Sequence, residues 1–227
     1  MMKGYFLFPS KTLFGKPIPK IKIYQFSDLN SATKEKFVSE VDKIIWQHKL
    51  SKETTNLAGT KEVPEIQIFN IYAKEKEVSE IVLKTIDRAI PFPIIFQIFS
   101  DDKIKIKAAY KRPSDSDKSK WVIDKYLETE WFDKNEEQKP LPLGLDLSKV
   151  YEQILHDLIP IEINHKEDSS IEDKICTLQK IQQLEKKYAQ LKSKRDKEKQ
   201  FNKKTIFNSD MKIITDEINT LRNNNGI

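Results

Sequence analysis

The chain is poor in the residues from which catalytic, metal-binding and disulfide-bonded sites are built. Its 227 residues include 5 Gly, 1 Cys and 3 His. So few glycines leave little material for the glycine-rich loops that bind phosphates, and no nucleotide-binding or hydrolase motif occurs. One cysteine, Cys176, excludes an intramolecular disulfide, and three scattered histidines do not build a Cys/His zinc cage. We therefore expect no cofactor and no metal.

Long apolar runs are missing as well. No run approaches the roughly 18 apolar residues that a membrane span requires. The apolar stretch Tyr5–Phe8 near the N-terminus ends at Pro9 and is shorter than the apolar region of a signal peptide. Together with the lone thiol and the many lysines, this predicts a cytoplasmic protein that does not contact the membrane.

Charge is abundant but unevenly distributed. Charged residues make up 33% of the chain and hydrophobic residues 38%, which suits a modest core with solvated helices. The formal net charge of +5 falls entirely on the segment from Ile171 onward, which has 13 Lys/Arg and 8 Asp/Glu. No proline follows Pro160, and residues 164–170 are polar. We therefore predict an α+β domain over residues 1–163, a linker over 164–170 and a helical interaction segment over 171–227.

Hydrophobic periodicity predicts the elements of the first domain. Alternation predicts strands at 20–26, 65–72, 94–99, 104–110 and 121–131, with a hairpin between the third and fourth. Helical spacing predicts helices at 32–49, 77–89 and from about 148 to 159. The order is β-α-β-α-β-β-β-α, in which only the first two connections are helical crossovers. The fold class is therefore α+β with a mixed sheet.

The C-terminal segment carries two short apolar seams with coiled-coil spacing. The seams are out of phase, which favours two helices joined near residues 201–208 over one bent helix. We expect an antiparallel helical hairpin, and each seam is too short to be stable alone. The hairpin must therefore pack on itself, on the first domain, on a second copy or on a partner. The predicted partner-binding residues are Ile181, Leu184, Tyr188, Leu191, Met211, Ile214, Ile218 and Leu221.

Acidic side chains suggest one alternative, a Mg²⁺-dependent nuclease of the restriction-endonuclease-like class. Such a nuclease needs carboxylates at the ends of neighbouring strands to hold the metal and activate water. Asp101, Asp102, Glu128 and Glu130 come nearest to this pattern. Turn chemistry explains the two aspartates equally well, and an exposed strand face explains the two glutamates. His48, beside Trp46, and Cys176 are interpreted as structural.

Two basic clusters suggest contact with nucleic acid, whose phosphates attract Lys and Arg. The first lies at the end of a predicted strand and includes Lys107, Tyr110, Lys111 and Arg112, with Lys118 and Lys120 across a loop. The second lies at the proposed joint of the helical hairpin, where the charge is not balanced locally. A solvated surface is the alternative for both. The second cluster contains Lys192, Lys194, Arg195, Lys197, Lys199, Lys203 and Lys204.

Several segments taken in order carry a family likeness: residues 44–57, 65–69, 89–96, 108–113, 140–142, 145–147 with 151–152, and 198–204. Together they resemble the bacterial and archaeal "domain of unknown function 4391" family. The resemblance implies gene neighbourhoods with helicases and DNA methyltransferases in restriction-like, anti-phage clusters. It defines no catalytic residues and no reaction.

These observations predict a non-enzymatic accessory or adaptor subunit of a DNA-restriction or antiviral defence complex. Its C-terminal helices would dock onto a larger helicase or methyltransferase, with additional DNA contact. The divergent nuclease remains the alternative.

Overall fold

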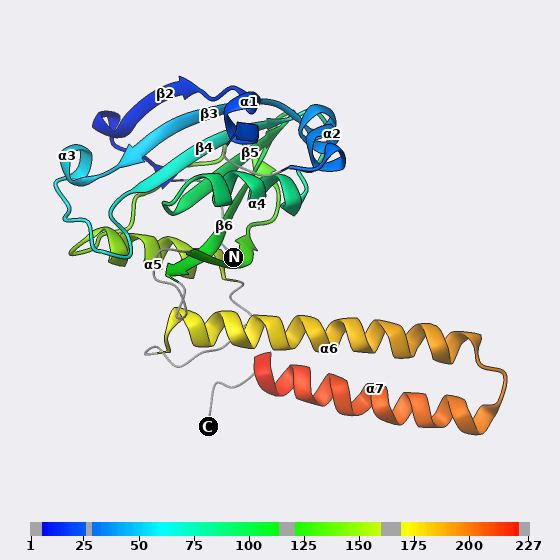
Figure 1. Ribbon diagram of the computed structural model, residues 1–227. Helices are drawn as coiled ribbons and strands as arrows, with labels where there is room; N and C mark the ends of the chain where they lie inside the picture. Colours follow the sequence, from blue (N-terminus) through cyan, green and yellow to red (C-terminus); the bar gives the residue numbers. More distant parts are fainter. Residues whose placement is uncertain (1–5, 26–28, 114–120, 160–168, 223–227) are drawn as a thin grey trace. The chain divides into compact units, whose positions relative to one another are not determined.

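The computed structural model describes residues 6–25, 29–113, 121–159 and 169–222. The chain divides into two compact units, Met1–Leu158 and Ile159–Ile227 (Figure 1). Of the predicted linker, only Ser169 and Ser170 fall within the described residues, and Ser170 caps the next helix by accepting a hydrogen bond from the Asp173 N–H. No helix in the described part of the chain is long and apolar enough to cross a bilayer.

The first unit is built around one large sheet. Its principal strands are β2 (Leu13–Pro17), β3 (Val41–Leu50), β4 (Ile66–Ala73), β5 (Ile94–Ser100), β6 (Lys103–Pro113) and β7 (Trp121–Glu128), side by side in that order. β4 and β5 are parallel and the other neighbours are antiparallel. The short strand β8 (Phe132–Asp133) pairs with β6, and β1 (Phe6–Leu7) pairs in parallel with β9 (Lys139–Pro140). The sheet is therefore mixed, as predicted.

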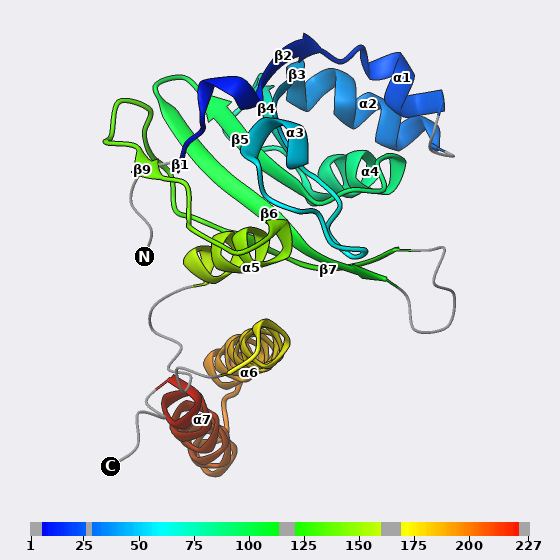
Figure 2. The ribbon, with the colours of Figure 1, turned by 90° about the vertical axis from the view of Figure 1, so that its left-hand side faces the viewer.

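Helices cover both faces of this sheet. Helices α1 (Lys20–Gln25), α2 (Ser31–Glu40) and α4 (Glu80–Ala89) supply Ile23, Phe37, Val82, Leu83 and Ile86 to one core cluster. Helix α5 (Leu147–Leu158) contacts β6 and β7, and Figure 2 shows α4 and α5 on opposite sides of these strands. Two shorter elements, the 3-10 helix η1 (Ser10–Thr12) and α3 (Lys52–Thr55), flank β2 and β3.

The main error of the sequence interpretation lies between residues 20 and 50. The predicted strand at 20–26 is helix α1, and the predicted helix at 32–49 ends at Glu40, after which Val41–Leu50 form β3. The apolar residues of this segment fit a helical period, but β-branched and aromatic residues also suit a strand. Pairing with β2 on one side and β4 on the other decides in favour of the strand.

The second unit is the predicted antiparallel helical hairpin. Helices α6 (Ile171–Lys197) and α7 (Phe201–Arg222) run side by side (Figure 1). The turn is shorter and earlier than predicted, because it comprises residues 198–200 and α7 already begins at Phe201. The Glu198 carboxylate accepts hydrogen bonds from the N–H groups of Lys199 and Gln200 at 2.8 and 2.9 Å, and thereby satisfies donors at the turn.

Candidate functional site

The most deeply buried charges of the first unit form an ion pair between a sheet lysine and a helix aspartate. Lys111 comes from β6 and Asp87 from α4, and each side chain is 1% exposed. The Lys111 Nζ lies 3.1 Å from the Asp87 Oδ1. It donates hydrogen bonds to the backbone carbonyls of Asp87, Ile90 and Phe92 at 2.8, 2.7 and 2.8 Å. The Lys111 ammonium has three protons, and the three carbonyls accept all of them. The Asp87 carboxylate therefore balances the charge of Lys111 without accepting a hydrogen bond at Oδ1.

This arrangement stabilises the end of a helix. The last carbonyls of a helix have no partner within it, and Lys111 supplies one just where α4 ends at Ala89. Burial raises the pKa of Asp87, although the charge of Lys111 opposes that shift, and burial lowers the pKa of Lys111 against the attraction of Asp87. The prediction that Lys111 contacts nucleic acid is therefore wrong, because its ammonium lies in the core. The side chain of Arg112, and Lys118 with Lys120, lie outside the described residues.

Two tyrosines extend the cluster to the neighbouring elements. The Tyr126 hydroxyl, from β7, donates to the Asp87 Oδ2. The Tyr151 hydroxyl, from α5, donates to the Ala109 carbonyl and accepts from the Lys111 N–H at 3.3 Å. Burial raises the pKa of both tyrosines, so both remain protonated donors. The cluster thus ties α4 and α5 to the sheet from its two faces, and it is closed to ligands.

A second charge cluster lies on the α4 side of β6. The Lys105 Nζ contacts the Glu77 Oε1 at 2.7 Å, and the Lys107 Nζ contacts the Glu128 Oε2 at 2.6 Å. Each glutamate also faces the other lysine, at 3.7 and 3.8 Å. The Trp131 Nε1 donates to Glu77 at 3.1 Å. Burial alone would raise the pKa of Glu77, but the hydrogen bond from Lys105 and the charge of Lys107 outweigh burial and lower it.

The four carboxylates of the nuclease hypothesis are not brought together. Asp102, in the β5–β6 turn, pairs with Lys134, and Asp101 adopts the positive φ of a turn residue. Glu128 lies opposite Lys107, which is five residues along the chain from Asp102, or about 16 Å at strand spacing. Glu130 is exposed. The described residues contain no group of three or more His, Cys, Asp and Glu that could hold a metal ion.

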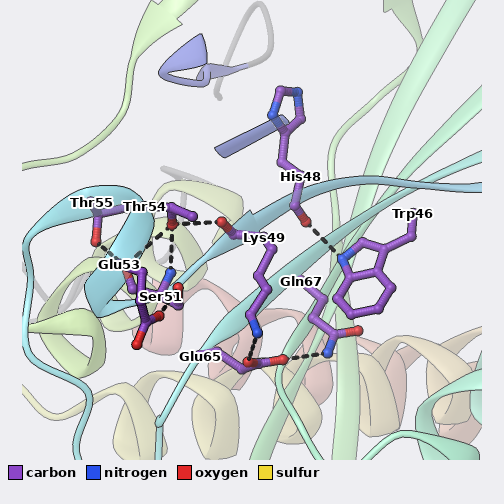
Figure 3. A network of polar contacts seen from close by, with 9 residues as sticks. All are labelled: Trp46, His48, Lys49, Ser51, Glu53, Thr54, Thr55, Glu65 and Gln67. Atoms are coloured by element: carbon purple, nitrogen blue, oxygen red, sulfur yellow. Dashed lines mark hydrogen bonds and ion pairs between the residues drawn. The ribbon is translucent and has the colours of Figure 1, made fainter. Parts of the chain in front are cut away.

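A third polar network surrounds the end of β3 and the start of α3 (Figure 3). The Lys49 Nζ contacts the Glu65 Oε2 at 2.8 Å, and the Glu65 Oε1 accepts from the Gln67 Nε2 at 2.6 Å. The Ser51 N–H donates to the Thr54 Oγ1 at 2.9 Å, and the Thr54 hydroxyl donates to the Lys49 carbonyl at 2.8 Å. These bonds fix the change from strand to helix, which is a structural role.

His48 is the one ring of this network that points away from it (Figure 3). The Thr12 hydroxyl donates its hydrogen to the Pro9 carbonyl at 2.6 Å, so at 2.9 Å it accepts from the His48 Nδ1–H. Phe8 stacks on the ring, with centroids 4.8 Å apart. Burial lowers the pKa of His48. His48 lies on β3, not on the predicted helix, and the interpretation as a structural histidine stays a prediction.

In the hairpin, the predicted partner-binding residues lie in the seam between α6 and α7. Ile181, Met211, Ile214 and Ile218 are buried, and the other four are half-buried. Ion pairs between Lys180 and Glu217 and between Arg222 and Glu185 join the two helices. The hairpin therefore packs on itself, and partner binding through these eight side chains stays a prediction.

The outside of the hairpin carries apolar residues that the sequence interpretation missed. Phe201, Ile206 and Ile213 on α7 are 80%, 59% and 63% exposed. These three positions do not follow the spacing of the seam residues. Large apolar residues off the seam were the sequence signal that could have identified them. Beside them, the basic residues gather at the turn, where Arg195 contacts Asp196 and Asn208. Contact of this basic turn with DNA stays a prediction.

The Asp87–Lys111 pair was missed because its signal is weak. Asp87 interrupts the apolar face of α4 immediately after Ile86, and a charged residue on such a face indicates a buried partner. Nothing in the sequence says that the partner is Lys111, 24 residues away.

Comparison with protein families gives a match over most of the chain. The model of a family described as a domain of unknown function (DUF4391) matches residues 6–218. No curated protein and no solved structure matches the chain.

The buried ion pair predicts a strong, non-additive effect on stability. Lys111→Met leaves the Asp87 carboxylate without its opposite charge and three carbonyls without the Lys111 donor, so we expect a loss of about 3–5 kcal/mol of unfolding free energy. Adding Asp87→Leu removes the uncompensated charge and should restore part of that loss. Urea denaturation of both single variants and the double variant measures the coupling. Additive losses would show that the two charges do not interact.

The lowered pKa of His48 predicts that the stability of the fold depends on pH. Because its folded pKa lies below the ordinary value of 6.5, the unfolded state binds a proton first as pH falls. The stability that the neutral ring contributes is present above pH 6.5 and is lost as pH falls through the folded pKa. We therefore expect His48→Gln to lose less stability than the wild type between pH 7.5 and 5.5 in urea denaturation. The exposed His156→Gln is the control, and an identical slope for wild type and His48→Gln would contradict the prediction.

Proposed function

The chain belongs to the family of the domain of unknown function DUF4391, and from this premise we propose that it is a non-enzymatic accessory subunit. In this proposal its C-terminal helical hairpin docks onto a larger protein partner. The partner class, a helicase or DNA methyltransferase of a restriction or anti-phage defence complex, follows from the family resemblance. The protein would act in the cytoplasm and would contact DNA as an additional interaction.

The observation that carries the proposal is the exposed apolar surface of α7. The seam between α6 and α7 is already filled, yet Phe201, Ile206 and Ile213 face solvent. Ile206 and Ile213 are seven residues apart and therefore lie on one face of α7, and exposed large apolar side chains on one face are typical of interaction surfaces. The hairpin turn at the start of α7 is in addition basic, which favours a partner or a nucleic acid with negative charge.

The nuclease alternative has less support. Asp102 and Glu128 are engaged by lysines, and the strand register separates them. No observation favours a metal-dependent reaction at these residues.

The docking proposal is tested in the full-length chain. Ile206→Asp combined with Ile213→Asp places charges at two largely exposed positions outside the seam between α6 and α7. We expect unchanged helicity in circular dichroism and loss of the helicase or methyltransferase from pull-downs in the native host, quantified by mass spectrometry. Ile21→Asp on α1, where the side chain is equally exposed at 63%, is the matched control. Deletion of residues 171–227, which removes α6 and α7, should abolish partner binding as well, and a partner that survives both changes would contradict the proposal.

The DNA contact is tested by its dependence on salt. Seven cations lie between Lys192 and Lys204 against Asp196 and Glu198, an excess of five. If five of them meet phosphates, log affinity should fall against log salt concentration with a slope of about −4 to −5, and binding should be largely lost by about 0.2 M salt. Fluorescence anisotropy with duplexes of different sequence measures this.

A matched charge control makes the assignment specific. Reversal of Lys199, Lys203 and Lys204 to Glu should weaken DNA binding, whereas reversal of the exposed Lys11, Lys34 and Lys61 changes net charge equally and should not. Equal effects of the two triple variants, or binding that ignores salt, would remove the hairpin turn as the DNA contact.

A further inference from the structure

Two leucines of the first unit are almost fully exposed. Leu143 and Leu145 are 97% and 93% exposed, more than any other exposed large apolar side chain of the described chain. They belong to the segment Pro140–Leu145, which has no charge although 33% of the chain is charged. A fully exposed leucine forfeits the stabilisation that burial would give, about 1.5–3 kcal/mol. Two such side chains on one short segment therefore need an explanation.

The segment has the alternation of an extended strand. Leucine occurs at every second position from 141 to 147, so the leucines share one face if the backbone is extended. Gly144, between the two exposed leucines, faces α5, because a Cβ atom there would lie 3.0 Å from the backbone N of Val150. Leu143 and Leu145 accordingly point the other way, into solvent.

Both ends of the segment are held by the fold. On one side Pro140 pairs with Leu7 of β1. On the other side the Leu147 N–H donates to the Ala58 carbonyl at 2.9 Å, and the Asp146 Oδ1 accepts from the Lys149 N–H at 2.9 Å. Pro140 and Pro142 restrict φ between these anchors. The leucines are therefore presented on a preorganised segment, which lowers the entropy cost of binding.

We propose that Leu143 and Leu145 insert into an apolar groove of a protein partner that receives extended peptide segments. The size of the surface argues for a groove. Even together with Leu7, which is 58% exposed, the leucines offer a few hundred Å², whereas a stable interface between two copies needs about 800 Å² from each. A groove encloses an extended segment and buries more of each side chain, and the uncharged sequence fits an uncharged groove.

This inference rests on the proposed function as an accessory subunit and extends it. The hairpin and the leucine segment belong to different compact units of the chain. An accessory subunit with a docking element on each unit can join two proteins, or hold one protein at two places with increased avidity.

The test begins with site-specific photo-crosslinking in the full-length chain. A photoreactive phenylalanine analogue replaces Leu143 in the native host, and the same analogue replaces Ile21 as the control, since Ile21 is also exposed. The crosslinked protein is identified by mass spectrometry and purified. Its affinity is then measured by calorimetry for the wild type and for the variant with Leu143→Ser and Leu145→Ser, with a synthetic peptide of residues 138–147 as competitor.

We expect one protein to crosslink at position 143 and not at position 21. The double serine variant should bind the crosslinked protein at least about a hundred-fold more weakly than the wild type. The peptide should compete with the wild type for this protein, and the thermal unfolding temperature of the serine variant should be unchanged. No specific crosslink, a crosslink to a second copy of this chain, or equal affinity of the serine variant would each overturn the inference. The variant with Ile206→Asp and Ile213→Asp separates the two proposals. If this variant loses the partner while the double serine variant still binds it, the result supports docking by the hairpin and rejects docking by the leucine segment.

Discussion

The first unit depends on the burial of one ammonium group, that of Lys111. Removing a charge from water is costly unless it is neutralised and hydrogen-bonded. Asp87 supplies the opposite charge, and three carbonyls at and just after the end of α4 accept the protons of the Lys111 ammonium. These partners come from a helix and the chain that follows it, so satisfying Lys111 requires α4 to lie at one position on the sheet. Because α4 connects the parallel strands β4 and β5, a fixed position of α4 on the sheet also restrains this connection.

Three further lysines of this unit have carboxylate partners. Lys105 and Lys107 have Glu77 and Glu128, and Lys49 has Glu65. A catalytic centre needs groups that can change their charge or bind a new partner. Groups that already bind one another this closely are poor candidates, so the polar clusters of the sheet are best explained by stability. Unbalanced charge is instead found on the hairpin, where it can attract a partner.

Sequence patterns predict the elements that local periodicity defines. Strand β4, helix α4, the β5–β6 hairpin and the two C-terminal helices all follow from apolar spacing. Residues 41–50 do not, because their apolar positions fit two periods and pairing with β2 and β4 decides between them. The same limit applies to the sites. In the sequence, Lys111 resembles a surface cation within a basic stretch, and only the packing of α4 against the sheet shows that its side chain is buried. The outer residues of α7 escape prediction because they lie off the seam.

The contrast between Leu147 and its neighbours Leu143 and Leu145 shows where folding alone does not explain the sequence. All three belong to one alternating pattern, and the fold buries Leu147 completely while it leaves the other two in water. A serine or threonine at either exposed position would cost this fold no packing, and it would avoid unfavourable hydration of a large apolar side chain. Leu143 and Leu145 therefore contribute nothing to the folded chain by itself. Burial in a protein partner, as proposed above, would supply the stabilisation that the fold does not give them, and the docking proposal assigns the same role to Ile206 and Ile213 on the hairpin.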